Sequence, residues 1–109
     1  MNVYTPRLES MLRDWPSIAA HRPLFVTEFG ADPAWFGSRG AGYAAMWRTI
    51  RAHPGYVLGG APYTWTTTGP EPRDQRWGLL DAQSQPVDDT FELLTAEWRK
   101  EKRGPGRCR

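Results

Sequence analysis

The sequence predicts an α/β fold made of parallel strand–helix units. Two apolar runs, at residues 24–26 and 56–65, have the length and composition of buried parallel strands, which are covered on both faces. Around them, residues 8–15, 43–53 and 87–102 carry apolar side chains at the spacing of one helix face. Strands that alternate with helices in this way are typical of a parallel sheet.

The first unit lies at the N-terminal end of the chain. Residues 2–4 have the pattern of a short strand end, and Pro6 disfavours helix in the residue before it. Residues 8–15 follow as a helix with one apolar face. Pro16 is expected to end, kink or restart this helix, because proline lacks the N–H that a helix interior requires.

The central part of the chain predicts a strand, a loop and a second helix. The strand is centred on residues 24–26. Residues 30–42 are rich in glycine, proline and aromatic side chains, which favours a loop. Residues 43–53 form the predicted helix, and Pro54-Gly55 ends it.

The last unit begins with the strand predicted at residues 56–65. Its two adjacent glycines are typical of a site where a neighbouring backbone or a ligand approaches closely. A polar loop is expected at residues 66–76, followed by an apolar segment at 77–81 and a turn. Residues 87–102 then form the closing helix.

Composition excludes several classes of protein. The 109 residues suit one small domain, and an apolar content of 39% argues against disorder. Cys108 is the single cysteine, so no intramolecular disulfide can form. No stretch of about 18 apolar residues is present, so no membrane partner is expected. Residues 1–7 lack the apolar run of a signal peptide, which predicts a cytoplasmic location if Met1 is the true start.

The net charge of +2 hides an uneven distribution. Residues 99–109 contain six basic side chains and one acidic one, whereas the rest of the chain has eight basic and eleven acidic. Residues 103–109 are expected to form a disordered basic tail. No aromatic residue is interleaved with these charges, and the body of the chain is acidic, so no nucleic-acid partner is expected.

Glu28 is a candidate functional residue because it directly follows a buried strand. A carboxylate in that position costs free energy unless it has a partner or a function. Open sheets and barrels both place their ligand sites at the carboxyl ends of parallel strands. The alternative is that Glu28 is exposed to water or pairs with a nearby cation such as Arg39.

Thr27-Glu28-Phe29-Gly30 resembles the T-E-[FY]-G motif that ends the seventh strand of retaining glycoside hydrolases with (β/α)8 barrels. This clan includes β-glucuronidases, β-galactosidases and cellulase-like and mannanase-like enzymes. Residues 59–65 resemble its eighth strand, and residues 77–81 with Gln85-Pro86 resemble the approach to its last helix. Residues 2–4 are similar to the end of its sixth strand. The resemblance runs in register along nearly the whole chain.

The resemblance implies a fold and a site. The fold would be part of a (β/α)8 TIM barrel, from the end of strand six to helix eight, over residues 1–102. The activity would be hydrolysis of the O-glycosidic bonds of a β-linked saccharide with retention of configuration, which needs a carboxylate nucleophile and a carboxylic acid about 5–5.5 Å away. No metal or other cofactor is implied, and the partner would be a carbohydrate substrate. The implied site residues are Glu28 as nucleophile, Tyr4 as its orienting hydroxyl, Trp65 as the floor of the sugar site, and Trp35 and Trp77 at neighbouring subsites.

The second catalytic carboxylate is missing from this pattern. In the clan it follows an asparagine, but the single asparagine here, Asn2, precedes Val3. Glu71, in the loop after residues 56–65, is only a weak substitute. A complete barrel takes about 250 residues. The sequence is therefore expected to be the C-terminal part of a barrel, inactive alone and free to self-associate through open sheet edges.

The remaining conspicuous residues have structural explanations. Trp15, Trp47 and Trp98 lie on helix faces and are expected to pack against the sheet. Charged loop residues are expected to be solvated, and the histidines at helix ends to have capping or surface roles. The charged residues are Asp32, Arg39, Asp74 and Arg76, and the histidines are His21 and His53.

Two functions from other classes remain open. A carbohydrate-binding domain would use the same tryptophans to hold a glycan without cutting it. A small α/β interaction domain would instead bind an anionic partner through its basic tail.

Overall fold

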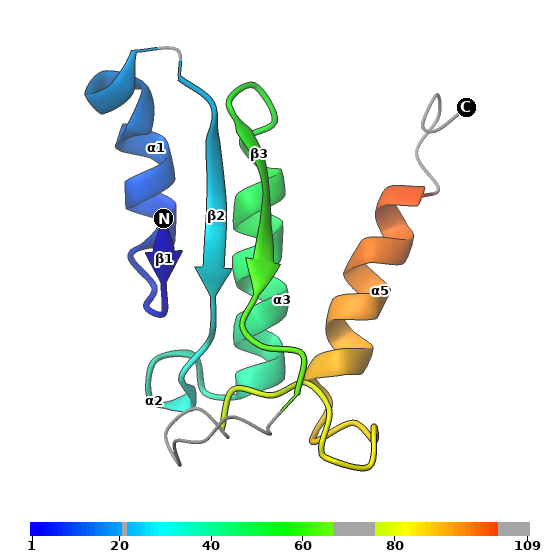
Figure 1. Cartoon of the computed structure of the whole chain (residues 1–109). Helices are drawn as coiled ribbons and strands as arrows, with labels where there is room; N and C mark the ends of the chain where they lie inside the picture. Colours follow the sequence, from blue (N-terminus) through cyan, green and yellow to red (C-terminus); the bar gives the residue numbers. More distant parts are fainter. Residues whose placement is uncertain (21, 67–75, 103–109) are drawn as a thin grey trace.

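A computed structural model describes residues 1–20, 22–66 and 76–102 of the chain. This part is a mixed α/β domain with one three-stranded parallel sheet and four helices (Figure 1), which confirms the predicted α/β class and the parallel sheet. The elements in chain order are β1 (Asn2–Val3), α1 (Leu8–Ala19), β2 (Leu24–Phe29), α2 (Pro33–Phe36), α3 (Arg39–Arg51), β3 (Val57–Pro62) and α5 (Thr90–Lys102).

The register of the sheet brings the carboxyl ends of its strands to one edge. The strand order is β1-β2-β3, with Asn2 opposite Glu28 and Val3 opposite Phe29. Phe29 in turn lies opposite Pro62 of β3. The three strands therefore end side by side, at the lower end of the sheet in Figure 1.

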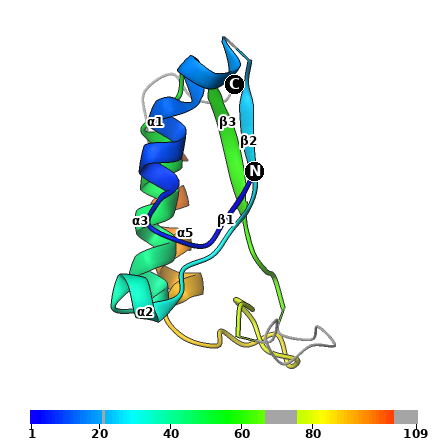
Figure 2. The same cartoon turned by 90° about the vertical axis from the view of Figure 1, so that its left-hand side faces the viewer.

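The helices cover one face of the sheet only. α1, α3 and α5 all lie on the same side of the strands, as the view in Figure 2 shows. On β2, the side chains of Leu24 and Val26 are buried, while Phe25 between them is exposed. Leu58 of β3 is 68% exposed. The expectation that both strands are covered on both faces is therefore wrong for the described part of the chain, because no described element packs on the second face.

α1 continues through Pro16 instead of ending or restarting there. Proline in a helix interior removes one hydrogen bond and crowds the preceding turn. Packing of the preceding turns offsets this cost, since Leu8 and Leu12 are buried in the core and Trp15 packs against it. The helix ends before Ala20, which has a positive φ of 23°.

The predicted loop at residues 30–42 contains helical structure. Asp32 caps α2 by accepting a hydrogen bond from the Ala34 N–H, and Pro33 occupies the first turn. α3 begins at Arg39, four residues before the predicted start, and Gly42 lies inside it. A Cβ on Gly42 would lie 2.4 Å from the Ala31 Cβ. Glycine here serves close packing rather than a turn, so the composition of this segment is misleading.

Two further boundaries differ by three residues from the predicted ones. β3 ends at Pro62 rather than at residue 65, and α5 begins at Thr90 rather than at residue 87. The peptide bond after β3, between Tyr63 and Thr64, is cis.

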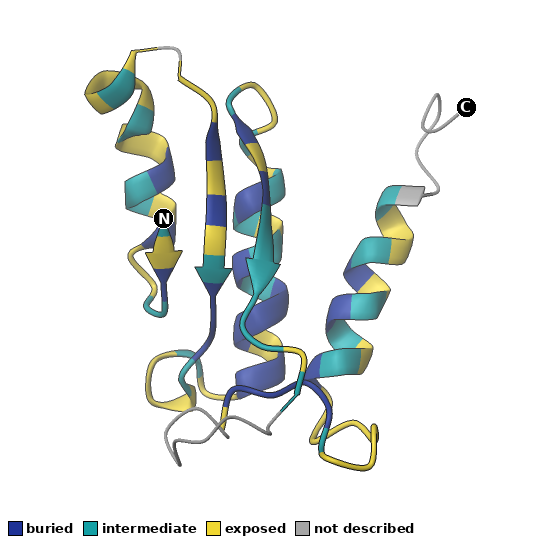
Figure 3. Cartoon of the chain, in the orientation of Figure 1, coloured by how far each residue is buried: buried dark blue, intermediate teal, exposed yellow. Residues whose placement is uncertain are grey.

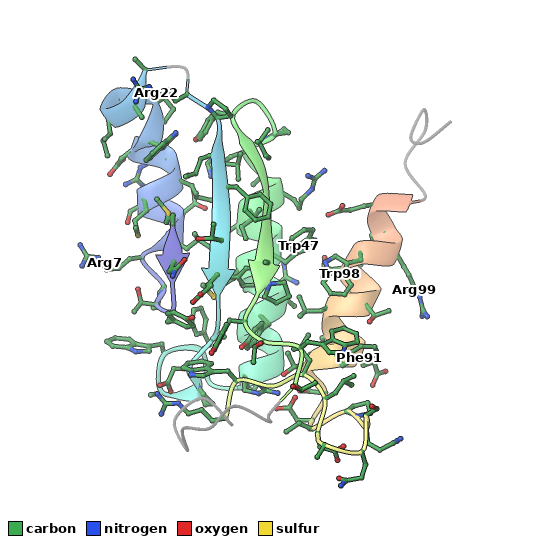
Figure 4. The ribbon with its side chains drawn as sticks, viewed as in Figure 1. Arg7, Arg22, Trp47, Phe91, Trp98 and Arg99 are labelled. Carbon is green, nitrogen blue, oxygen red and sulfur yellow. The ribbon has the colours of Figure 1, made fainter. Side chains whose placement is uncertain are left out.

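α3 and α5 pack against each other through aromatic and charged side chains. The rings of Trp47 and Trp98 meet edge to face at 6.0 Å between centroids, and Figure 4 shows them between the two helices. Arg48 donates to Glu97 at 2.8 Å. Trp47 and Trp98 both pack against the core, so the structural roles predicted for them and for Trp15 are confirmed. Figure 3 shows many buried positions along α3, whereas buried and exposed positions alternate on β2.

Candidate functional site

Tyr4 and Glu28 form a hydrogen-bonded pair at the edge where the strands end. Tyr4 directly follows β1, and Glu28 is the second-to-last residue of β2. The Tyr4 hydroxyl donates to Oε2 of Glu28 at 2.5 Å. Both side chains are half-buried. The structure thus brings together the two residues that the resemblance implicates as nucleophile and orienting hydroxyl.

The electrostatics of this pair keep the proton on the tyrosine. Burial, and then the hydrogen bond and negative charge of Glu28, raise the pKa of Tyr4 well above its ordinary value. The phenol therefore remains a donor throughout the physiological range.

Aromatic rings hold Tyr4 in place. Its ring lies 5.1 Å from that of Trp77, centroid to centroid, and 6.1 Å from that of Tyr63. A Cβ on Gly30 would lie 2.8 Å from Cδ1 of Tyr4 and 3.1 Å from Cε3 of Trp77. The glycine that follows Phe29 therefore leaves room for both rings, which gives the fourth residue of the T-E-F-G segment a physical role.

Trp77 reaches this edge because its segment lies against the chain that leaves β3. The Thr64 N–H donates to the Trp77 carbonyl at 3.0 Å, and the Leu79 N–H donates to the Thr64 carbonyl at 2.9 Å. The Trp77 side chain is only 9% exposed. It acts as a wall that supports Tyr4.

These residues surround a cavity of about 450 Å³, within the range of small-ligand sites. Its walls hold three aromatic rings besides Tyr4, two carboxylates and one guanidinium. The described residues that line it are Tyr4, Thr5, Glu28, Asp32, Trp35, Tyr63, Arg76 and Trp77. We name it the Glu28 cavity.

The three predicted sugar-binding tryptophans lie in different environments. Trp35, on α2, is 63% exposed and lines the Glu28 cavity together with the buried Trp77. Trp65 is also exposed, but it is not among the described residues that line this cavity. Its ring and that of Phe91 meet edge to face, with centroids 6.0 Å apart. Figure 4 labels Phe91, which lies at the start of α5. The structure therefore separates Trp65 from the other two.

Arg39 is not a solvated loop charge, so the expectation for this residue is wrong. Its guanidinium donates to both carboxylate oxygens of Asp88, at 2.8 and 2.9 Å, and to the carbonyls of Arg76 and Gly78. These acceptors satisfy the charge and allow it to be buried, with 8% exposure. Arg39 thereby ties the segment that carries Trp77 to α3.

Asp88 is the ionised partner in this arrangement. Burial alone would raise the pKa of its carboxyl, but hydrogen bonds from Arg39 and Thr90 outweigh burial and lower the pKa to about 2. The pair is structural, because Asp88 does not line the Glu28 cavity.

The other charged residues and histidines singled out in the sequence lie partly at the Glu28 cavity and partly elsewhere in the chain. Asp32 lines the cavity while one of its oxygens caps α2. Arg76 is exposed, and its guanidinium lies 4.9 Å from the centre of the Trp77 ring. His53 lies after α3 and is half-buried, with its Nδ1 2.9 Å from the Tyr56 hydroxyl, so a surface role is wrong for it. Glu71, Asp74, His21 and the tail at 103–109 lie outside the described residues.

Sequence reasoning missed Thr5 and Tyr63 as lining residues. Both come just after strands of the sheet, β1 and β3, although the predicted strand extended past Tyr63 to residue 65. The signal that singled out Glu28, a position at the carboxyl end of a parallel strand, applies equally to them.

Two structural findings and a comparison with known proteins bear on the class of site. In residues 1–20, 22–66 and 76–102, no cluster of three or more His, Cys, Asp or Glu is placed to hold a metal ion. None of the helices in those ranges is long and apolar enough to span a bilayer. Searches with protein-family models, among curated proteins and among solved structures found no significant match to the chain.

Proposed function

We propose that Glu28 is the nucleophile of a retaining glycosidase that acts on a β-linked saccharide. The observation that carries the proposal is the Tyr4–Glu28 hydrogen bond at the ends of adjacent parallel strands, inside a cavity walled by Trp35 and Trp77. An aromatic wall suits the apolar face of a sugar ring, and the carboxylate suits attack on its anomeric carbon. The proposal includes the fold that the resemblance implies, a sheet that is part of a (β/α)8 barrel.

The chemistry divides into two displacements. A Glu28 oxygen bonds to the anomeric carbon while the bond to the leaving oxygen breaks, which produces a glycosyl ester and an alcohol once the leaving oxygen gains a proton. The oxygen of water then bonds to the same carbon as the ester bond breaks, which releases the sugar, the carboxylate and a proton to the solvent. The Tyr4 hydroxyl holds Oε2, whereas Oε1 accepts no hydrogen bond from any described residue. The carboxylate is therefore oriented through one oxygen, while the other has no partner among the described residues.

The first displacement also needs an acid to protonate the leaving oxygen. The sequence contains no Asn-Glu pair, so the residue that the resemblance implies for this role has no counterpart here. A leaving group that departs as a stable anion needs no such proton. The test of Glu28 can therefore be made independent of the acid.

The experiment is a rapid-mixing assay with 2,4-dinitrophenyl β-glycosides of glucose, galactose and mannose. With the sugar that the site accepts, we expect a burst of about one dinitrophenolate per chain, because the glycosyl ester forms faster than it hydrolyses. Glu28→Gln should abolish the burst. Glu92→Gln, an exposed carboxylate on α5, is the matched control and should leave it unchanged. Absence of a burst with all three sugars, or a burst that survives Glu28→Gln, would contradict the proposal.

A carbohydrate-binding function is the second candidate. It is favoured by Trp35, a large aromatic side chain that is 63% exposed at the rim of the Glu28 cavity. Such a protein would bind methyl β-glycosides but give no burst. Self-association through the edge strands β1 and β3 stays a separate prediction, which sedimentation of the purified chain would test.

A further inference from the structure

Pro16 leaves one backbone carbonyl of α1 without its usual partner. In an α-helix each carbonyl accepts a hydrogen bond from the N–H four residues later, and a proline has no N–H to donate. The carbonyl affected by Pro16 is that of Leu12. Tyr56, just before β3, supplies the missing donor, because its hydroxyl donates to the Leu12 carbonyl at 2.7 Å. The single hydroxyl hydrogen of Tyr56 is therefore engaged with α1.

This hydrogen bond determines which nitrogen of His53 carries a hydrogen. Nδ1 of His53, in the turn after α3, lies 2.9 Å from the Tyr56 hydroxyl oxygen. Since that hydroxyl already donates to Leu12, it can only accept from His53, so the neutral imidazole has its hydrogen on Nδ1. Nε2 is then an acceptor that carries no hydrogen.

The Nε2 atom of His53 is buried and faces a carboxylate. It has no hydrogen-bond partner among the described residues. Oε1 of Glu9, in the first turn of α1, lies 3.5 Å away from it. Two acceptors at this distance cannot bond to each other, and a buried polar atom without a partner costs free energy. One proton placed between Nε2 and the carboxylate would satisfy both atoms.

The other charged side chains of α1 and α3 close to this position in the chain have partners elsewhere. Arg51, the last residue of α3, pairs with Glu101 at 3.1 Å. Arg13, one turn after Glu9 on α1, pairs with the residue that follows it. Of the described charged residues, Glu9 is therefore the one that faces the imidazole of His53.

We propose that the folded chain binds a proton between Nε2 of His53 and Glu9, and that this proton joins α1 to the turn after α3. The proton comes from the solvent and converts the imidazole to imidazolium, whose Nε2–H donates to the carboxylate. The first turn of a helix favours a negative side chain, which keeps Glu9 as the acceptor. The inference is independent of the function proposed for Glu28, because neither His53 nor Glu9 lines the Glu28 cavity.

The proposal predicts the sign of a pH dependence. An imidazole ordinarily loses its proton near about pH 6.5. A proton that the folded chain binds in preference to the unfolded chain stabilises the fold below this pH, and the stabilisation is lost as the pH rises above it. Urea unfolding between about pH 5.5 and 8.5 measures the change in the unfolding equilibrium constant.

Glu9→Gln is the diagnostic variant, because its amide can donate to Nε2 without a bound proton. Over this pH range we expect the unfolding equilibrium constant of the unaltered chain to rise about tenfold relative to that of Glu9→Gln. Glu92→Gln is the matched control, since it removes an exposed carboxylate from the first turn of α5. It should keep the pH dependence of the unaltered chain, and at about pH 8.5 it should be less stable than Glu9→Gln.

The hydrogen on the His53 ring can also be observed directly. His21→Asn leaves His53 as the single histidine of the chain, so nitrogen NMR of the ring reports on this residue alone. At about pH 8.5 we expect the hydrogen on Nδ1. Adding Tyr56→Phe removes the acceptor of Nδ1 and should move the hydrogen to Nε2, where the neutral ring donates to Glu9.

The two measurements decide the proposal together. A ring with its hydrogen on Nδ1, and a pH dependence that is lost in Glu9→Gln and kept in Glu92→Gln, support it. A ring with its hydrogen on Nε2 while Tyr56 is present overturns it. Equal pH dependence in the unaltered chain and in Glu9→Gln overturns it as well.

Discussion

The Tyr4 hydroxyl lies 2.5 Å from Oε2 of Glu28, although the two residues are 24 positions apart in the chain. Their meeting depends on the register of β1 and β2, in which Asn2 lies opposite Glu28 and Val3 opposite Phe29. A shift of one residue would turn the side chains of either strand to the other face. The pair is therefore a direct consequence of the parallel sheet, and it is the basis of the proposed chemistry.

Tyr4→Phe is expected to slow formation of the glycosyl ester at Glu28. The variant removes a hydrogen bond to a charged group, worth about 1.5–3 kcal/mol, which corresponds to a decrease of about 10- to 100-fold in rate. The rate of the dinitrophenolate burst measures this effect. The ring remains, so its packing with Trp77 should be preserved.

Tyr56→Phe provides the control for that substitution. The Tyr56 hydroxyl donates to the Leu12 carbonyl at 2.7 Å, and its removal should lower the free energy of unfolding by about 1 kcal/mol. The burst rate should not change, because Tyr56 does not line the Glu28 cavity. Equal burst rates in Tyr4→Phe and in the unaltered chain would mean that Tyr4 does not orient the nucleophile.

Gly30→Ala is expected to disturb the site more than an ordinary surface change does. The new methyl group would lie 2.8 Å from the Tyr4 ring, so that ring or the strand must move. Overpacking of this kind costs about 1–3 kcal/mol of stability, and a displacement of about 1 Å near reacting groups can lower a rate about 100-fold. Urea unfolding and the burst assay measure the two effects.

Gly55→Ala is the matched substitution, because no atom of a described residue other than its chain neighbours lies within 4 Å of the added methyl group. Stability and burst rate should both stay close to those of the unaltered chain. If Gly30→Ala behaves like Gly55→Ala, the close packing of Tyr4 against the backbone after β2 is not required.

The Arg39–Asp88 pair predicts a loss of stability in acid. The pKa of Asp88 is lowered to about 2 in the folded chain, from its ordinary value of 3.8. A lowered folded pKa means that the stabilisation is present above about pH 4 and is lost as the pH falls toward 2. Asp88→Asn should make urea unfolding less dependent on pH in this window. It should also cost about 1–2 kcal/mol at pH 7, less than a fully buried pair, because Asp88 is 36% exposed.

Asp14→Asn tests an ion pair of the same kind that is exposed to solvent. Arg13 and Asp14 are both largely exposed, at a separation of 3.2 Å. Exposed pairs contribute little, so the variant should stay within about 0.5 kcal/mol of the unaltered chain at pH 7. A larger effect from Asp14 than from Asp88 would contradict the structural role assigned to Arg39.

Much of the fold could be predicted because apolar periodicity is a local signal, and it gives the alternation of strands and helices along the chain. The alternation of strands and helices predicted parallel strands, which put Glu28 at the edge where such strands end, and the resemblance implied that Tyr4 lies beside it. Helix boundaries were harder to predict from the sequence. From the sequence, Gly42 suggests a loop, because the close approach of Ala31 that requires a glycine there is visible only in the structure. Pro16 likewise suggests a helix end, because the burial of Leu12 that stabilises the helix is visible only in the structure.

Long-range charge pairing was the least predictable feature of the site. Arg39 and Asp88 are separated by 49 positions, and nothing in the spacing of either residue indicates the other. Likewise, the exposure of Phe25 and Leu58 depends on which face of the sheet the helices cover. Such features follow from the assembled packing, and only the three-dimensional structure shows them.

The identity of the nucleophile can be measured directly by trapping the glycosyl ester. The chain would be incubated with 2,4-dinitrophenyl 2-deoxy-2-fluoro-β-glycosides, whose fluorine slows hydrolysis of the ester, and the product analysed by intact mass and by fragmentation of its peptides. We expect one adduct per chain, located on Glu28 and not on the nearby Asp32, and no adduct in Glu28→Gln. Failure to form an adduct with glucose, galactose or mannose reagents, or an adduct on another residue with Glu28 unmodified, would contradict the central claim.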